Sequence, residues 1–134
     1  MGTKVKKKMI LGVGIDIIEL DNFLRVYNFL KKRKILSLVF FEEELKFQKE
    51  IKKLAGIWAL KEAVYKTISP FLKREILLNQ IKITKNSGKI EVSLKSDFFL
   101  PKYRKKFFSR KRIKFFLSLT YSKNLVIALA VAEI

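Results

Sequence analysis

Two stretches of the chain are almost continuously apolar, and each predicts a buried element. Residues 9–18 are β-branched and apolar with glycines between them, a composition typical of a buried strand. Residues 51–68 carry apolar side chains around most of a helical circumference, and the dipeptide Ser69-Pro70 ends this pattern. We therefore expect a buried strand near the N-terminus and a central helix surrounded by other elements.

Shorter patterns predict the remaining elements. Helical spacing after a capping residue, Asp21 or Asn22, predicts a helix that reaches about residue 30. The other predicted elements are a short one at 35–41, a helix at 42–49, strands at 76–85 and 89–95 around an Asn86–Gly88 turn, a basic aromatic helix at 98–110, and a final hairpin of 113–121 with 125–133. This order predicts a single α+β domain over 1–134, with a mostly antiparallel sheet around the central helix.

The composition removes several classes of enzyme. The chain has no cysteine and no histidine. Disulfides, thiolate or imidazole metal sites and a Ser-His-Asp mechanism are therefore excluded. An enzyme built from these residues has to use carboxylates, lysines, hydroxyls or a metal ion held by carboxylates.

The net charge indicates an anionic partner. Thirty lysines and arginines stand against twelve acids, a formal charge of +18. Nucleic acid, a membrane surface, a polyphosphate or an acidic protein would each fit, although a lysine-rich background composition explains part of the excess. Residues 102–116 combine charge with aromatic rings, which favours an RNA-binding protein as the alternative function. They match no RNA-binding signature, and we expect Phe107, Phe108, Phe115 and Phe116 to lie in the core.

No segment predicts secretion or membrane insertion. The lysine-rich start is followed by an apolar run that Asp16 interrupts, and no small-residue cleavage site follows it. The late apolar run, 125–132, is far shorter than the roughly 20 residues that span a bilayer. We expect a soluble, cytoplasmic protein.

Two carboxylates lie in apolar surroundings. Asp16 interrupts the N-terminal strand, and Glu62 lies on the central helix. Charge in such surroundings is costly unless it is paired or binds a metal, and two carboxylates with open positions for water and phosphate suit Mg²⁺. The alternative is ordinary ion pairing, since Glu62 and Lys66 stand at i, i+4. Lys61 and Lys66 project from different sides of the helix, toward phosphates or toward solvent.

The glycines before Asp16 have a structural interpretation. Gly12-Val13-Gly14 begins like a dinucleotide fingerprint, but Ile17 stands at the third glycine and Asp16 would repel a pyrophosphate. We expect these glycines instead to let the backbone pass close to a neighbouring element.

Taken together, these segments resemble the holo-acyl-carrier-protein synthases, the short class of 4′-phosphopantetheinyl transferases. The resemblance covers nearly the whole chain, and its most specific part is Leu54 through Lys66, similar to the family's Leu-Ala-Gly-Arg-Phe/Trp-Ala-x-Lys-Glu-Ala-x-x-Lys pattern. The other matching segments are Gly12 to Glu19, Phe40 to Leu45, Asn86 to Lys89, and Ser118 to Ser122. Two residues depart from the pattern: Ile57 stands where the family has Arg, and Tyr121 where it has His.

The resemblance implies a fold of the 4′-phosphopantetheinyl transferase type and a reaction. The 4′-phosphopantetheine group of coenzyme A would move to a serine of apo-acyl carrier protein in fatty acid biosynthesis, leaving adenosine 3′,5′-bisphosphate. Phosphoryl transfer depends mainly on positioning and charge neutralisation, so the absence of histidine is no obstacle to it. Because Tyr121 is a poor proton acceptor, an inactive member that only binds coenzyme A is a further alternative.

The resemblance also implies roles for particular residues. Asp16 and Glu62 would hold Mg²⁺, and together with Lys66 they would be the catalytic residues. The expected contacts to coenzyme A are Lys61, Lys66, Gly88, Lys89, Thr120, Tyr121 and Ser122. The basic helix after the first strand, with Arg25, Lys31 and Lys32, would dock the acidic carrier protein, and the chain would form a homotrimer with its sites between subunits. No nucleic-acid partner is expected.

Overall fold

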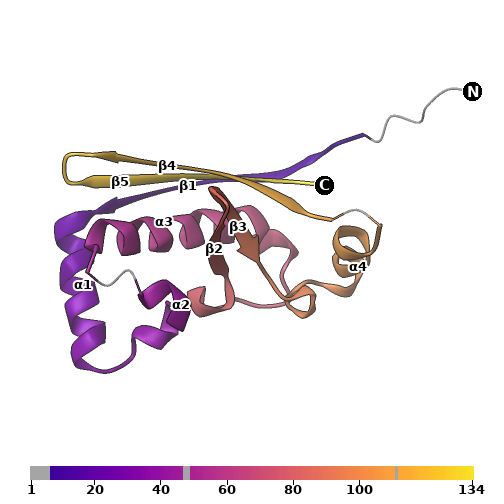
Figure 1. Ribbon diagram of the computed structural model, residues 1–134. Coiled ribbons are helices and arrows are strands. Elements are labelled where there is room, and N and C mark those ends of the chain that lie inside the picture. The colour runs from indigo at the N-terminus through magenta and orange to yellow at the C-terminus, as the bar shows by residue number, and fades with distance from the viewer. Residues whose placement is uncertain (1–6, 47–48, 111) are drawn as a thin grey trace, which may run out of the picture.

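The computed structural model describes residues 7–46, 49–110 and 112–134. Its helices and strands, labelled in Figure 1, are β1 (Ile10–Glu19), α1 (Leu20–Lys32), α2 (Glu42–Leu45), α3 (Ile51–Ile68), β2 (Lys82–Asn86), β3 (Lys89–Ser93), α4 (Pro101–Lys105), β4 (Lys114–Ser122) and β5 (Leu125–Glu133). Single 3₁₀ turns lie at Leu36–Leu38, Ser69–Phe71, Leu78–Gln80 and Ser96–Phe98, and α4 continues into a π-helical turn at Lys106–Arg110.

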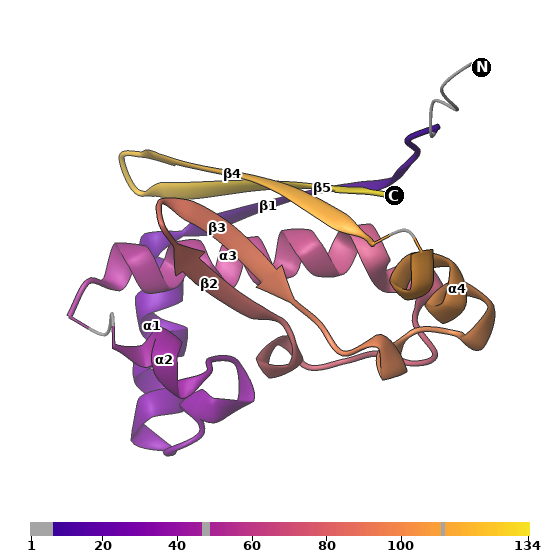
Figure 2. The ribbon, with the colours of Figure 1, turned by 45° about the vertical axis from the view of Figure 1, so that its right-hand side comes forward.

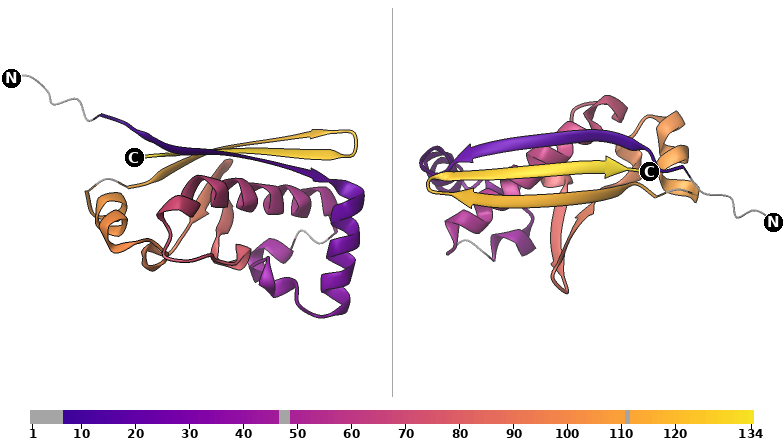
Figure 3. Two further views of the ribbon diagram at one scale, coloured as in Figure 1. Left: turned by 180° about the vertical axis from the view of Figure 1, so that it is seen from behind. Right: turned by 90° about the horizontal axis from the view of Figure 1, so that it is seen from above.

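The larger sheet has the order β1-β5-β4, and both of its pairings are antiparallel. The long helix α3 lies along one face of this sheet, as Figures 1 and 3 show from opposite sides. The inner face of β5 consists of Val126, Ala128, Ala130 and Ala132, all fully buried. Small side chains at these positions let the helix approach closely, because little volume separates the two backbones.

Glycine in β1 serves the same close approach. A Cβ at Gly14 would overlap the carbonyl group of Ala63 on α3, and one at Gly12 would stand 2.7 Å from the carbonyl oxygen of Thr67. The expectation that these glycines let β1 pass close to a neighbour is therefore confirmed. The contact brings the first half of β1 beside the second half of α3.

The other face of the sheet is apolar along β1 and β5, and its β1 residues are exposed. On β1, Val13, Ile15 and Ile17 are 57%, 54% and 60% exposed, and β5 residues Val131, Leu129 and Ile127 lie opposite them in register. Phe116 on β4 is 54% exposed on the same face, so its assignment to the core was wrong. The physical reason is strand alternation: Phe115 points inward, and its neighbour therefore points outward.

The remaining sides of α3 are covered by α1, α2 and the β2–β3 hairpin, which forms a separate two-stranded sheet (Figure 2). Phe23 and Tyr27 of α1 and Phe40 pack into this main core. A second cluster near α4 contains Ile68, Leu72, Phe99 and Phe107, with Phe108 and Phe115 partly buried against it. The rings of the basic segment, apart from Phe116, thus belong to the core as expected.

Four elements are shorter than their sequence patterns predicted, and one of them is the strand expected at 89–95, which ends at Ser93. The helix expected at 42–49 ends at Leu45, and residues 47 and 48 lie outside the described residues. The strand expected from residue 76 begins at Lys82, because Leu78–Gln80 form a 3₁₀ turn. The helix expected at 98–110 begins only at Pro101, a residue suited to the first helical turn.

Candidate active site

The close contact between β1 and α3 brings three predicted site residues together. Asp16 projects from the inner face of β1, two residues after Gly14, toward the helical turn that carries Glu62 and Lys66. The Nζ atom of Lys66 lies 2.7 Å from the carbonyl oxygen of Ile15 and 3.3 Å from Oδ1 of Asp16. The Lys66 side chain is 49% exposed and that of Asp16 is 18% exposed, so this ion pair faces solvent on one side.

The surroundings of Asp16 and Glu62 disfavour negative charge and raise the pKa of both carboxyl groups. Burial raises the pKa of Asp16, and the ammonium of Lys66 only partly offsets this effect. Burial and then the negative charge of Asp16 raise the pKa of Glu62, while a hydrogen bond from Trp58 and the charge of Lys66 act in the opposite direction. Mutual repulsion of this kind is relieved when a divalent cation binds between two carboxylates.

The residues present therefore fit a magnesium ion. Within the described ranges, no group of three or more histidine, cysteine, aspartate or glutamate side chains could hold a metal. Asp16 and Glu62 would thus supply only two protein ligands. Magnesium commonly binds one or two carboxylates and takes its other oxygens from water and substrate phosphates, so a two-carboxylate site suits it.

Lys61 does not belong to this group, and its predicted contact with a phosphate is wrong. The side chain is fully buried, and its Nζ lies 2.6 Å from Oε1 of Glu44. The same ammonium donates to the carbonyl oxygens of Val39 at 2.8 Å and Leu78 at 3.2 Å. All three of its hydrogens are thereby used, and none remains for a ligand.

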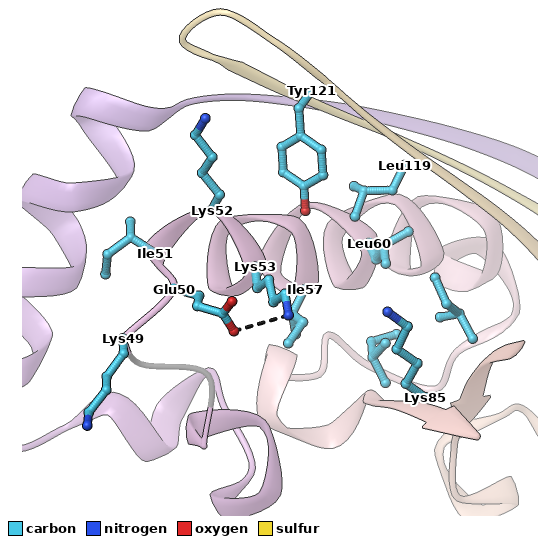
Figure 4. A pocket seen from close by; sticks show the side chains of 12 residues that line it. Lys49, Glu50, Ile51, Lys52, Lys53, Ile57, Leu60, Lys85, Leu119 and Tyr121 are labelled. Atoms are coloured by element: carbon cyan, nitrogen blue, oxygen red, sulfur yellow. Dashed lines mark ion pairs between the residues drawn. The ribbon is translucent and has the colours of Figure 1, made fainter. Parts of the chain in front are cut away.

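A pocket of about 880 Å³ lies on another side of α3 (Figure 4). Its floor is apolar, with contributions from Ile57, Leu60 and Leu119, and four lysines line it at positions 49, 52, 53 and 85. Lys53 forms an ion pair with Glu50 at 3.1 Å. Such a pocket can take a ligand that combines a flat apolar group with several negative charges.

Tyr121 reaches from β4 over the first turns of α3 into this pocket (Figure 4). A Cβ at Gly56 would lie 2.6 Å from the Tyr121 hydroxyl, so glycine is what allows the ring to reach the helix. Burial raises the pKa of Tyr121, with a smaller opposing effect from Lys53. The hydroxyl therefore keeps its proton at neutral pH and serves as a hydrogen-bond donor.

These sites agree with a comparison to known proteins. The family model of the 4′-phosphopantetheinyl transferase superfamily matches residues 12–130, which include both the carboxylate pair and the pocket. The chain belongs to this superfamily.

Relatives within the superfamily match along almost their full length. A holo-acyl-carrier-protein synthase of Clostridium tetani is 31% identical over 93% of this chain and 97% of its own. The crystal structure of holo-acyl-carrier-protein synthase from Neisseria meningitidis has a TM-score of 0.66, with 26% identity over 92% of this chain and 98% of that one. The acyl carrier protein synthase of Plasmodium yoelii with ADP bound gives 0.62, with 25% identity over 96% and 98%. The expected family, fold class and reaction type are thus confirmed.

The remaining predicted residues of this phosphopantetheinyl transferase lie apart from one another. Gly88, with a φ of 80°, and Lys89 form the exposed tip of the β2–β3 hairpin, whose Lys85 and Ile90 line the pocket. Thr120 and Ser122 lie on the outer face of the sheet, opposite to the face from which Tyr121 projects. The docking candidates Arg25, Lys31 and Lys32 are all exposed on α1.

Sequence reasoning missed several contributors to the site. The lysines of the pocket lie mainly between α2 and the first turn of α3, and their clustering at 49–53 was the available signal. The hydrogen bond between Trp58 and Glu62 could have been inferred from their i, i+4 spacing on one helical face. Within the described part of the chain, no helix is long and apolar enough to cross a membrane.

Proposed function

We propose that this chain transfers the 4′-phosphopantetheine group of coenzyme A to a serine of apo-acyl carrier protein, with Mg²⁺ held by Asp16 and Glu62. The products are holo-acyl carrier protein and adenosine 3′,5′-bisphosphate. The observation that carries the proposal is the half-buried carboxylate pair on β1 and α3, with the ammonium of Lys66 3.3 Å from Asp16. Phosphoryl transfer depends on positioning and charge neutralisation, and a cation site beside a lysine ammonium supplies both.

The magnesium ion and Lys66 would have distinct parts in the reaction, and Tyr121 would not accept a proton. Bound magnesium would neutralise the diphosphate of coenzyme A. Lys66, half exposed and held by Asp16 and the Ile15 carbonyl oxygen, can turn its ammonium toward the phosphate under attack. Because Tyr121 keeps its proton, the proton of the serine has to pass to a carboxylate or to water.

The lysine-lined pocket is the proposed site for the nucleotide end of coenzyme A. Its apolar floor can contact the adenine ring, while Lys52, Lys53 and Lys85 neutralise phosphate charge. These lysines would compensate for Ile57, which stands where the family has Arg. The ADP bound to the Plasmodium yoelii relative supports a nucleotide as the ligand class.

We place the complete site between subunits of a homotrimer. Ile57 and Glu62 are five residues apart, so they project about 140° from each other around α3, and one chain cannot present the pocket and the carboxylates on the same side. The exposed apolar sheet face, with Val13, Ile15 and Ile17, supplies a surface for association. Val13→Lys should yield monomers in light scattering and lose turnover. Leu77→Lys, at a position 56% exposed outside the sheet, should do neither.

Helix α1 is the proposed docking surface for the acidic carrier protein. It follows β1 directly, and Arg25 lies beside the exposed apolar residues Leu24 and Val26. Exchanging Arg25 and Lys32 for Glu should raise the KM for carrier protein about tenfold and leave the KM for coenzyme A unchanged. The same charge change at Lys102 and Lys105 of α4, at the other end of the molecule (Figure 1), is the matched control. An unchanged KM for the carrier protein would exclude this surface.

The decisive experiment is the intact mass of an apo-acyl carrier protein after incubation with this chain, coenzyme A and Mg²⁺. The expected result is the gain of one phosphopantetheine group, lost with EDTA or with Asp16→Asn. No gain from a folded protein would reject the proposal and favour the member that only binds coenzyme A. The RNA-binding alternative is disfavoured, because Phe107 of the basic segment is buried and the exposed Phe116 lies on the sheet face proposed for subunit association.

A further inference from the structure

The buried ion pair of Lys61 and Glu44 lies at the junction of five segments of the chain. Glu44, on α2, is 2% exposed, and its Oε1 accepts the backbone N–H of Phe41 at 2.8 Å as well as the Lys61 ammonium. Its Oε2 accepts the backbone N–H of Ile83 on β2 at 3.0 Å. Lys61 adds bonds to the carbonyl oxygens of Val39 and Leu78. Through these bonds, the pair connects α2, α3, β2, the segment before α2 and the 3₁₀ turn that begins at Leu78.

Aromatic rings complete the environment of this ammonium. The Nζ atom of Lys61 lies 4.9 Å from the ring centre of Phe41 and 5.8 Å from that of Phe40. Three hydrogen-bond acceptors and two ring faces thus replace the water that the charge has lost. Burial still lowers the pKa of Lys61, although Glu44 opposes the effect.

Two of the elements that the pair joins, α3 and β2, line the lysine-lined pocket. Leu60 precedes Lys61 on α3 and lines the floor, and Ile83 of β2, whose backbone N–H donates to Glu44, lines the pocket as well. A buried ion pair adds little net stability compared with apolar side chains of similar size, but its bonds impose one geometry on the groups around it. Its effect is therefore expected in the shape of the pocket more than in the stability of the fold.

We infer that Lys61 and Glu44 are positioning residues for coenzyme A: together they fix the distance between α3 and β2 and hence the width of the pocket. Neither side chain touches the ligand. The inference rests on the proposed function, because it assigns this pocket to the nucleotide end of coenzyme A. It also explains why a lysine stands directly before the metal-binding Glu62 without taking part in the chemistry.

A second, exposed ion pair supplies a matched control. Lys82 Nζ lies 3.2 Å from Oε1 of Glu43, and this pair also links β2 to α2, with side chains 31% and 63% exposed. Surface pairs contribute little to stability or geometry because water and salt screen them. The same two substitutions can therefore be made at both pairs, and only the buried one should affect the pocket.

The test compares Lys61→Met/Glu44→Gln with Lys82→Met/Glu43→Gln. Steady-state kinetics should give the buried double variant a KM for coenzyme A raised about tenfold, with kcat at saturating coenzyme A within about twofold of wild type. Hydrogen exchange at the Ile83 and Phe41 amides should accelerate by at least about tenfold in that variant, since both lose an acceptor charge. The exposed double variant should match wild type in each measurement.

The outcomes separate the inference from the proposed function. A folded buried variant with wild-type KM for coenzyme A, or with a fall in kcat alone, would overturn the inference. Should that variant fail to fold, Glu44→Asp provides the same test, because it keeps the charge but is too short to reach Lys61 and both amides at once. Failure of wild type to bind coenzyme A in calorimetry would instead reject the proposed function.

Discussion

Lys61 and Glu62 are neighbours on α3, yet one charge is paired within the protein and the other lies beside a like charge. Lys61 is fully buried, and its three hydrogens go to Glu44 and two carbonyl oxygens. Glu62 is half-buried beside another acid, Asp16, and its pKa is raised. The partners of the Lys61 charge all lie within the protein, although burial still lowers the pKa of this lysine, whereas the charge of Glu62 lacks a cation that would offset its burial and the repulsion from Asp16.

The difference separates structural charge from functional charge. A buried ion costs several kcal/mol unless its partners are all present, and the bonds of Lys61 provide them within the chain. A pair of carboxylates with raised pKa values is instead unfavourable in the free protein and becomes favourable when a cation binds. The extent of compensation, more than the residue type, therefore indicates which charge serves the reaction.

The largest effect expected from this comparison is on turnover. Glu62→Gln keeps the size of the side chain but removes one of the two proposed magnesium ligands, so kcat/KM should fall at least about 10³-fold, equivalent to about 4 kcal/mol. The mass assay on apo-acyl carrier protein measures it, with Glu43→Gln as the control at an exposed acid. Turnover above a hundredth of wild type in Glu62→Gln would remove Glu62 from the metal site.

The next largest effect is a loss of stability, and it is expected when Lys61 is replaced. Lys61→Met leaves Glu44 buried without its cation, which should lower the free energy of unfolding by about 3 kcal/mol. Lys66→Met, which breaks a half-exposed pair, should change it by less than about 1 kcal/mol while abolishing most turnover. Urea unfolding followed by circular dichroism measures both. Equal stability losses in the two variants would contradict the division between structural and functional charge.

Sequence patterns predicted most of the fold because its elements are locally encoded. The structure confirms the helix predicted at 51–68, the close approach predicted from the glycines at 12 and 14, and the turn predicted at Asn86–Gly88. The helix at 98–110 was overestimated, because the continuation past Lys105 takes a π-helical form that no spacing rule detects. The prediction that Phe116 lies in the core was wrong, because it rested on composition and not on strand alternation.

The candidate site was likewise predictable only where local sequence patterns reveal it. The grouping of Asp16, Glu62 and Lys66 could be predicted, since charges within apolar runs stand out in a sequence and a family motif contains them, while their roles in the reaction stay predictions. The role of Lys61 could not, because its partner Glu44 lies seventeen positions earlier and meets it only after α2 packs on α3. A lysine beside a metal ligand suggests phosphate binding until the tertiary structure shows its partner.

The smallest effect is a pH dependence of stability in the absence of divalent cations. The folded-state pKa of Glu62 lies above its ordinary value of 4.5, so between these two pKa values the folded protein retains a proton that the unfolded chain releases. Stability therefore falls as pH rises through this window, and at neutral pH the folded state carries the full cost of the charge. Glu62→Gln removes that cost. The variant should be more stable than wild type at pH 7.5 by less than about 1 kcal/mol, because the group is only half-buried.

This advantage of Glu62→Gln should shrink toward pH 4.5 and disappear when Mg²⁺ is added to wild type. Thermal unfolding at several pH values would measure both changes. A pH-independent difference between the two proteins would show that packing, and not the cost of burying the Glu62 charge beside Asp16, separates them.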